Sequence, residues 1–205
     1  MTIVETVTAT DVAETTATTT ETVTLGAVAT QTATSTYTVP ANPILNGNLE
    51  NYKTTGNILP WTDTSATTGG LVQYVNGVNP CTAVGYCAGG TVVVRVYPPS
   101  SGGGYTAIKQ DALLAKPSTK YNVSFLYRCL NYDNGISGID VYYKGSNIGG
   151  ALCTSNSAAF QRVTTGVQFT TDATGVGSLE FRFKNPSNKF SMYIYADDFS
   201  ATAVV

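Results

Sequence analysis

The alternation of apolar and polar residues with a period of two constrains the fold of this chain more than any other feature. Leu179, Phe181 and Phe183 alternate with charged residues. Successive side chains of a β-strand point to opposite faces, so the pattern predicts strands with one buried and one exposed face. Residues 121–128 and 162–169 repeat it, and turn sequences separate the runs at the spacing of a sandwich. We therefore predict an all-β protein built as an antiparallel β-sandwich.

The first 38 residues differ from the rest in composition, because 16 of them are threonine and none is lysine or arginine. Such a segment has too little apolar bulk for a core, which favours an extended, O-glycosylated stalk. The alternative is that its β-branched alternation pairs at a sheet edge and joins neighbouring molecules. Pro40 and Pro43 follow the segment. We predict a boundary here, with residues 1–38 as stalk or edge-pairing arm and residues 39–205 as the sandwich domain.

The chain contains no histidine, and this absence excludes several kinds of chemistry. Serine–histidine and cysteine–histidine nucleophile pairs and histidine-containing zinc sites all require an imidazole. Charged residues make up only 12% of the chain and the net charge is −2. Lysine and arginine are scattered, so no basic patch predicts binding to nucleic acid. No apolar run reaches the roughly 20 residues needed to cross a bilayer, so a membrane partner is not expected.

Four cysteines and one sequon indicate an oxidising compartment. The even number of cysteines without C-x-x-C spacing favours disulfides over a metal site. Of three possible pairings we favour Cys81 with Cys87 and Cys129 with Cys153; buried free thiols are the alternative. Asn122 begins the single N-glycosylation sequon, NVS. Together these features predict an extracellular protein, secreted or associated with a cell wall.

Four segments appear in an order that resembles a known kind of module. They are NGNLE at residues 46–50, Pro60-Trp61, the stretch from Gln110 to Phe125, and DDFS at residues 197–200. This order is similar to that of secreted carbohydrate-binding modules of the galactose-binding-like jelly-roll type, related to families four, nine and twenty-two and found on fungal secreted proteins. The resemblance spans residues 44–205. It departs from the usual pattern at Leu49 and Phe199, where those modules carry phenylalanine and valine.

The resemblance implies a structural calcium ion where the first and last strands meet. In many such modules an early glutamate, backbone carbonyls and an acidic residue of the closing strand bind the ion. Carried over to this sequence, the ligands are Glu50 and either Asp197 or Asp198. Carboxylate and carbonyl oxygens suit calcium. The alternative is that Asp197 and Asp198 are solvated or satisfied by backbone N–H groups.

Tyrosine is the aromatic residue that favours glycan binding in this chain, since 13 are present and several fall on the polar side of their strands. A tyrosine ring packs against the C–H face of a sugar while its hydroxyl stays hydrated. Trp61 directly follows a proline at a strand start, which favours a place in the core. The predicted ligand-binding residues are Arg95, Tyr97, Tyr105, Tyr142, Gln168, Arg182 and Tyr193.

These observations favour a non-catalytic module that binds polysaccharide through a tyrosine-lined face. A glycosidase needs two suitably placed carboxylates, and the few acidic residues here fall in turns or on exposed faces. No nucleophile elbow, phosphate-binding loop or dinucleotide fingerprint occurs, so we predict that the chain is not an enzyme. The alternative function is a structural or adhesive surface protein that self-associates through residues 1–38.

Overall fold

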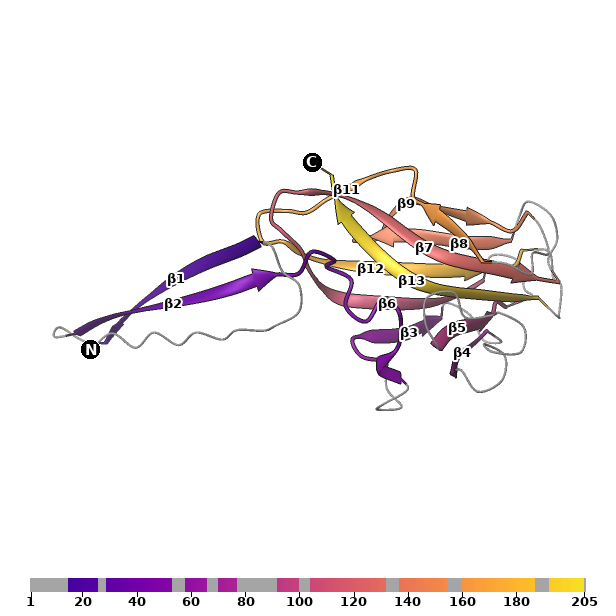
Figure 1. Cartoon of the computed structure of the whole chain (residues 1–205), viewed down its shortest axis with the longest axis horizontal. Coiled ribbons are helices and arrows are strands. Elements are labelled where there is room, and N and C mark those ends of the chain that lie inside the picture. The colour runs from indigo at the N-terminus through magenta and orange to yellow at the C-terminus, as the bar shows by residue number, and fades with distance from the viewer. Residues whose placement is uncertain are drawn as a thin grey trace.

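The computed structural model describes residues 15–25, 29–52, 58–65, 70–76, 92–99, 104–131, 137–154, 160–186 and 192–204. Within these ranges the chain forms a two-stranded ribbon and two larger antiparallel sheets. The two larger sheets face each other as a sandwich (Figure 1). The predicted all-β sandwich is therefore confirmed. No helix in this part of the chain is long and apolar enough to span a membrane.

The two sheets of the sandwich draw their strands from alternating parts of the sequence. The six-stranded sheet has the order β10-β7-β13-β5-β4 with β11 paired to β7, and the five-stranded sheet has the order β3-β6-β12-β8-β9. The six-stranded sheet contains β4 (Leu71–Asn76), β5 (Val92–Tyr97), β7 (Lys120–Leu130), β10 (Gln161–Thr164), β11 (Phe169–Thr170) and β13 (Tyr193–Ala203). The five-stranded sheet contains β3 (Trp61–Ser65), β6 (Tyr105–Leu114), β8 (Gly138–Tyr143), β9 (Ser146–Leu152) and β12 (Val176–Lys184).

An aromatic cluster joins the inner faces of the two sheets. Phe125 and Phe199 come from the six-stranded sheet, and Trp61 and Phe181 from the five-stranded sheet. All four side chains are at most 2% exposed. The ring centroids of Trp61 and Phe199 lie 5.1 Å apart, and those of Phe181 and Phe199 lie 4.6 Å apart. The predicted core position of Trp61 is confirmed. Tilted and edge-to-face ring pairs of this kind add to the burial energy of the core.

The predicted strand over residues 162–169 is wrong in its middle. β10 ends at Thr164 and β11 begins at Phe169. Between them the Thr165 N–H still donates to the Val123 carbonyl of β7 at 2.8 Å, but the Val167 N–H donates to the Ile148 carbonyl of β9 at 3.2 Å. Val167 is consequently 55% exposed, although its place in the alternation predicts burial.

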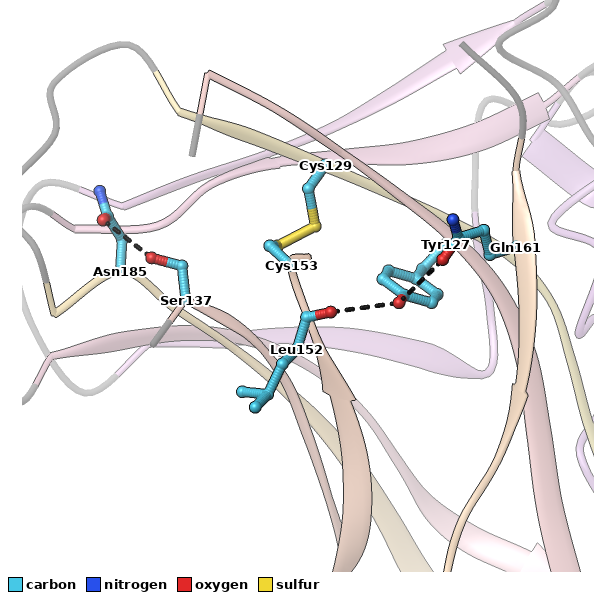
Figure 2. The surroundings of a disulfide bond; sticks show 7 residues. All are labelled: Tyr127, Cys129, Ser137, Leu152, Cys153, Gln161 and Asn185. Atoms are coloured by element: carbon cyan, nitrogen blue, oxygen red, sulfur yellow. Dashed lines mark hydrogen bonds between the residues drawn. A yellow bond between two sulfur atoms is a disulfide. The ribbon is translucent and has the colours of Figure 1, made fainter. Parts of the chain in front are cut away.

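A disulfide and a tyrosine bind the two sheets together along one side of the sandwich. Cys129 of β7 bonds to Cys153, which follows β9, so the predicted pairing of these two cysteines is confirmed (Figure 2). Close by, the Tyr127 hydroxyl donates to the Leu152 carbonyl at 3.1 Å. Cys81 and Cys87 lie outside the described residues. The confirmed bond links positions 24 residues apart and so restricts the unfolded chain.

A second link joins the sheets at the β3 and β4 edge. The Tyr74 hydroxyl of β4 donates to Asp63 Oδ1 of β3 at 2.6 Å. Burial raises the pKa of Tyr74 far above its ordinary value, and the hydrogen bond to the Asp63 carboxylate raises it further. We therefore expect the hydroxyl to stay protonated and the hydrogen bond to Asp63 to persist as the pH rises.

The opening segment, predicted as the first strand, instead forms turns over residues 44–48. Asn46 has φ 48° and Leu49 has φ 59°, which are left-handed values that a strand does not accommodate. The segment lies against the closing strand, because the Phe199 N–H donates to the Gly47 carbonyl at 2.9 Å. The Trp61 indole N–H donates to the Asn46 carbonyl at 2.9 Å. The opening turn is thus fixed to both sheets.

A β-bulge in β13 places Phe199 in the core. The pairing of β13 with β7 shifts register between Asp197 and Ser200, and Asp198 has φ 53°. Ala196 and Phe199 both face the interior although they are three residues apart, which regular alternation forbids. The extra residue, Asp198, shifts the alternation of inward and outward side chains by one position, so Phe199 and Ala201 point inward.

β1 (Thr15–Leu25) and β2 (Ala29–Val39) pair only with each other in the part of the chain that the structure describes. They form an antiparallel ribbon in which Thr15 pairs with Val39 and Leu25 with Ala29. Figure 1 shows this ribbon projecting from one end of the sandwich. The predicted division into residues 1–38 and 39–205 stays a prediction.

We expect Gly47→Ala to destabilise the sandwich by about 1–3 kcal/mol, the usual cost of overpacking. A Cβ atom at Gly47 would lie 1.9 Å from the Phe199 carbonyl oxygen, so the opening turn must separate from β13. Denaturant unfolding measures the change. Gly166→Ala is the matched control, because a Cβ there meets nothing within 4 Å. Equal stability of the two variants would contradict this account of the junction.

Candidate functional site

Two tyrosine rings and one guanidinium meet on the outer face of the five-stranded sheet. Arg182 lies two residues before the end of β12, and Leu179, Phe181 and Phe183 of the same strand face the core. The Arg182 Cζ lies 3.8 Å from the centroid of the Tyr142 ring and 4.4 Å from that of Tyr105. β8 supplies Tyr142 and β6 supplies Tyr105, the strands on either side of β12. The guanidinium therefore holds both rings in place by cation–π attraction.

The charges around these rings occur as ion pairs. Arg182 Nη2 lies 2.8 Å from Glu180 Oε2, and Lys184 Nζ lies 2.8 Å from Asp140 Oδ2. The hydrogen bond to Glu180 raises the pKa of Arg182, although burial opposes this effect. Arg182 consequently remains charged at any pH at which the protein folds. The two positive side chains and the two carboxylates therefore sum to a net charge of zero.

A cavity of about 300 Å³ opens at this place. We call it the Arg182 cavity, and its walls are Gly104, Tyr105, Asp140, Tyr142, Arg182, Lys184 and Pro186. Its volume is at the lower end of the range of about 300–1,000 Å³ in which small-molecule sites occur. Two aromatic rings, a guanidinium, an ammonium and a carboxylate can thus contact one ligand of modest size.

The other predicted ligand residues lie elsewhere, so the predicted set does not form a single site. Arg95, Tyr97 and Tyr193 belong to β5 and β13 of the six-stranded sheet. The rings of Tyr97 and Tyr193 meet edge to face at 4.6 Å. The Arg95 guanidinium bonds to the Gln73 side chain and lies 5.4 Å from the Tyr97 ring centroid. Gln168 is exposed, in the turn between β10 and β11.

Two groups of the Arg182 cavity, the Asp140 carboxylate and the Lys184 ammonium, were not among the residues predicted from the sequence. Asp140 lies directly opposite Arg182 in the β8–β12 register, and its carboxylate reaches Lys184 two residues along β12. The available indication was the alternating charge of Glu180, Arg182 and Lys184 on one strand face. Such a row requires opposite charges on the neighbouring strand.

The predicted metal ligands occupy the region where the opening segment meets β13. Glu50 Oε1 accepts the Val92 N–H at 2.8 Å, and the Asp197 side chain is fully buried. Asp198 Oδ2 instead pairs with Arg162 Nη2 at 2.9 Å. No group of three or more acidic or cysteine side chains in the described ranges is arranged to hold a metal ion. A cation here would need backbone carbonyls in addition to carboxylates.

Asn122, the start of the sequon, lies half-buried in β7 and pairs with Thr202 of β13. Its glycosylation stays a prediction.

Solved structures share this fold at low sequence identity. No protein-family model matches the chain, and no curated protein matches it. The carbohydrate-binding module TmCBM61, solved in complex with β-1,4-galactotriose, matches with a TM-score of 0.53 and 16% identity. The match covers 80% of this chain and 99% of that one. The resemblance to jelly-roll carbohydrate-binding modules is therefore confirmed at the level of the fold.

Enzymes share the fold as well. An arabinose-bound α-L-arabinofuranosidase, MgGH51, matches with a TM-score of 0.56 and 11% identity, over 81% of this chain and 27% of that one. A cyclase from Fischerella sp. TAU, in complex with 4-(1H-indol-3-yl)butan-2-one, matches with a TM-score of 0.54 and 18% identity, over 79% of this chain and 96% of that one. At such identities the likeness concerns the fold alone, and function has to be argued from the site.

Proposed function

We propose that this chain is a non-catalytic, extracellular carbohydrate-binding module that contacts polysaccharide at the Arg182 cavity. The observation that carries the proposal is the pair of rings, Tyr105 and Tyr142, held by one guanidinium in the wall of a cavity. Tyrosine rings offer an apolar surface to the C–H face of a sugar. Fixed rings lose little conformational entropy when a ligand binds, and this favours the complex.

The paired charges of the cavity favour a neutral sugar. The cavity offers a sugar two hydrogen-bond donors, Arg182 and Lys184, and one acceptor, Asp140. Because a sugar hydroxyl both donates and accepts, it can bond to either kind of group. Because each cation already has a carboxylate partner, an acidic sugar gains little Coulomb energy here. The complex of TmCBM61 with β-1,4-galactotriose makes that neutral oligosaccharide a suitable first probe.

The same ion pairs support a binding role rather than catalysis. Glycoside hydrolysis requires one carboxyl group that gives up a proton to the leaving group. Asp140, the carboxylate in the wall of the Arg182 cavity, is held by Lys184, and Glu180, which lies outside that wall, is held by Arg182. The chain also contains no histidine to act as acid or base.

The Cys129–Cys153 disulfide supports an extracellular location, secreted or bound to a cell wall. Disulfides persist in oxidising compartments and are rare in the cytosol.

We further propose a structural calcium ion held by Glu50 and Asp197. Asp197 follows Ala196, the partner of Val94, and the Glu50 carboxylate contacts the Val92 N–H, so both acids approach the same end of β5. The donors are oxygen atoms only, as calcium prefers. Asp198 fits less well because its carboxylate pairs with Arg162. A bound ion would fix the opening segment to the closing strand.

A second candidate function, self-association, rests on the β1–β2 ribbon. A two-stranded sheet on its own is at best marginally stable in water, and its outer edges offer unpaired backbone groups. Every even-numbered residue from 16 to 24 and from 30 to 38 is threonine, and the register makes them five directly paired threonine–threonine positions. A second copy of the ribbon presents the same β-prone edge, which favours pairing between molecules.

We expect Tyr142→Ala to weaken binding of β-1,4-galactotriose, or of whichever neutral oligosaccharide binds best, about tenfold or more, equivalent to ~1.4 kcal/mol. Isothermal titration calorimetry against galactan, glucan, chitin and xylan oligosaccharides measures the effect. Tyr97→Ala removes a tyrosine of the other sheet and is the matched control. An equal loss in both variants, or folded protein that binds none of these sugars, would contradict the proposal.

We expect calcium to raise the thermal midpoint of metal-stripped protein. At a concentration 100 times Kd the gain is about 2.7 kcal/mol, since the ion binds only the folded state. Scanning calorimetry with and without chelator measures it. Asp197→Asn should abolish the response, and Asp198→Asn should retain it. If calcium does not change the thermal midpoint of the unsubstituted protein, the proposed site is ruled out.

We expect the full chain to form oligomers that disappear when residues 1–38 are removed. Light scattering coupled to size-exclusion chromatography measures the mass. Thr20→Lys combined with Thr34→Lys tests the ribbon in the intact chain, because lysine on a β-edge opposes pairing. A full chain that stays monomeric at high concentration would remove the assembly role.

A further inference from the structure

A second cavity, of about 510 Å³, lies on the other sheet of the sandwich. It opens where the opening segment meets β13 and β10, and Asn42, Asn48, Arg162, Asp198 and Ser200 line it. We call it the junction cavity. The Arg182 cavity belongs to the five-stranded sheet, whereas Arg162, Asp198 and Ser200 come from the six-stranded sheet. The two cavities therefore share no residue.

Three asparagines line the junction cavity, and two of them, Asn42 and Asn48, are exposed and have amide groups whose orientation is fixed. Asn42 Oδ1 accepts the N–H groups of Ile44 at 3.1 Å and of Ala201 at 2.9 Å. Asn48 Oδ1 accepts the Glu50 N–H at 3.4 Å. Because each oxygen faces the backbone, each Nδ2 points away from it, and both residues are exposed. The cavity wall thus presents two amide donors.

Arg162 adds further donors without adding net charge. Its Nη2 pairs with Asp198 Oδ2 at 2.9 Å, and its side chain is 47% exposed. A guanidinium has five N–H groups, so others remain available to a ligand. The Asp198 carboxylate, 34% exposed, provides acceptor oxygens beside them.

This combination of groups disfavours a cation in the cavity. The asparagine oxygens, which a metal ion would require, already accept backbone N–H groups. The nitrogens that remain repel a cation. An anion gains little either, because Asp198 neutralises Arg162. Donors beside an acceptor, with no net charge, match the adjacent hydroxyl groups of a neutral sugar.

We propose that the junction cavity is a second glycan-binding site, which takes a single neutral sugar unit through hydrogen bonds. Its volume lies well inside the range of small-molecule sites. Phe199 is the aromatic residue of its lining, and this side chain is only 1% exposed. The site therefore lacks the ring platform of the Arg182 cavity and depends on hydrogen-bond geometry instead.

A module with one site on each sheet is bivalent. This consequence rests on the proposed function, whereas the junction cavity binds sugar independently of the Arg182 cavity. Because the sites lie on different sheets, two separate polysaccharide chains can occupy them, and the module then cross-links those chains. Linking two binding events raises the overall avidity without any new contact.

Isosteric substitutions test the junction cavity without disturbing its backbone contacts. Asn42→Asp and Asn48→Asp keep the oxygen that accepts the backbone N–H groups but replace the outward donor with an acceptor. We expect the double variant to reduce affinity at the second site about tenfold or more, since it loses two hydrogen bonds. Arg162→Gln supplies a second variant. Unchanged thermal midpoints verify that the variants fold.

The readout is the calorimetric stoichiometry with β-1,4-galactotriose and with neutral glucan and xylan oligosaccharides, together with turbidity of a soluble polysaccharide. We expect two sites in the unsubstituted protein, and one site and no turbidity in the double variant. A single site that only Tyr142→Ala removes overturns this inference and leaves the proposed function intact. A single site that only the asparagine variants remove supports the junction cavity and overturns the Arg182 cavity. Trigalacturonate is an acidic oligosaccharide, and its preferential binding at the junction cavity would contradict the assignment to a neutral sugar. The absence of binding to every oligosaccharide would also contradict that assignment.

Discussion

The hydrogen bond from the Phe199 N–H to the Gly47 carbonyl is the contact on which most of this architecture depends. It requires the bulge at Asp198, because regular alternation would point Phe199 outward. It also requires glycine at position 47, since a Cβ atom there would collide with Phe199. Phe199 then meets Trp61 and Phe181, so one backbone contact couples the opening turn to the aromatic core. The same junction produces the second cavity.

Charge pairing on the outer faces gives the surface its chemical character. Among the described residues, Lys109, Lys144, Arg182 and Lys184 of the five-stranded side and its turns are each paired with a carboxylate, as is Arg162 of the other sheet. One of these ion pairs, between Lys144 and Asp172, holds the pKa of Asp172 well below its ordinary value, mainly through their hydrogen bond. Exposed pairs of this kind add little stability. Their effect is to leave a surface of fixed dipoles with little net charge, which suits neutral, hydroxyl-rich ligands.

The sequence predicted the layers better than the places where they meet. Alternation identified the buried faces of β7 and β12, because each strand has one face in the core and one face toward solvent. It failed at Val167, where a hydrogen bond to Ile148 on the other sheet outweighs the local pattern. It also took the opening segment for a strand, since the left-handed backbone at Asn46 and Leu49 depends on contacts made far along the chain. The candidate ligand residues divided between two faces because strand order within a sheet cannot be read from sequence order. Arg182, Tyr105 and Tyr142 share a surface only through the pairing of β6, β12 and β8.

A fold shared by a sugar-binding module and by cyclases does not determine the function of a new member. The decisive difference is what the charged groups in a cavity are free to do. A catalytic carboxyl must exchange a proton during the reaction, so its environment has to shift between charge states. Asp140 in the wall of the Arg182 cavity is fixed by Lys184, and Glu180 beside the cavity is fixed by Arg182, whose guanidinium also lies over the Tyr142 ring. Such an arrangement is rigid and electrically balanced before any ligand arrives. Rigidity and balance of this kind favour the recognition of a neutral ligand that we propose.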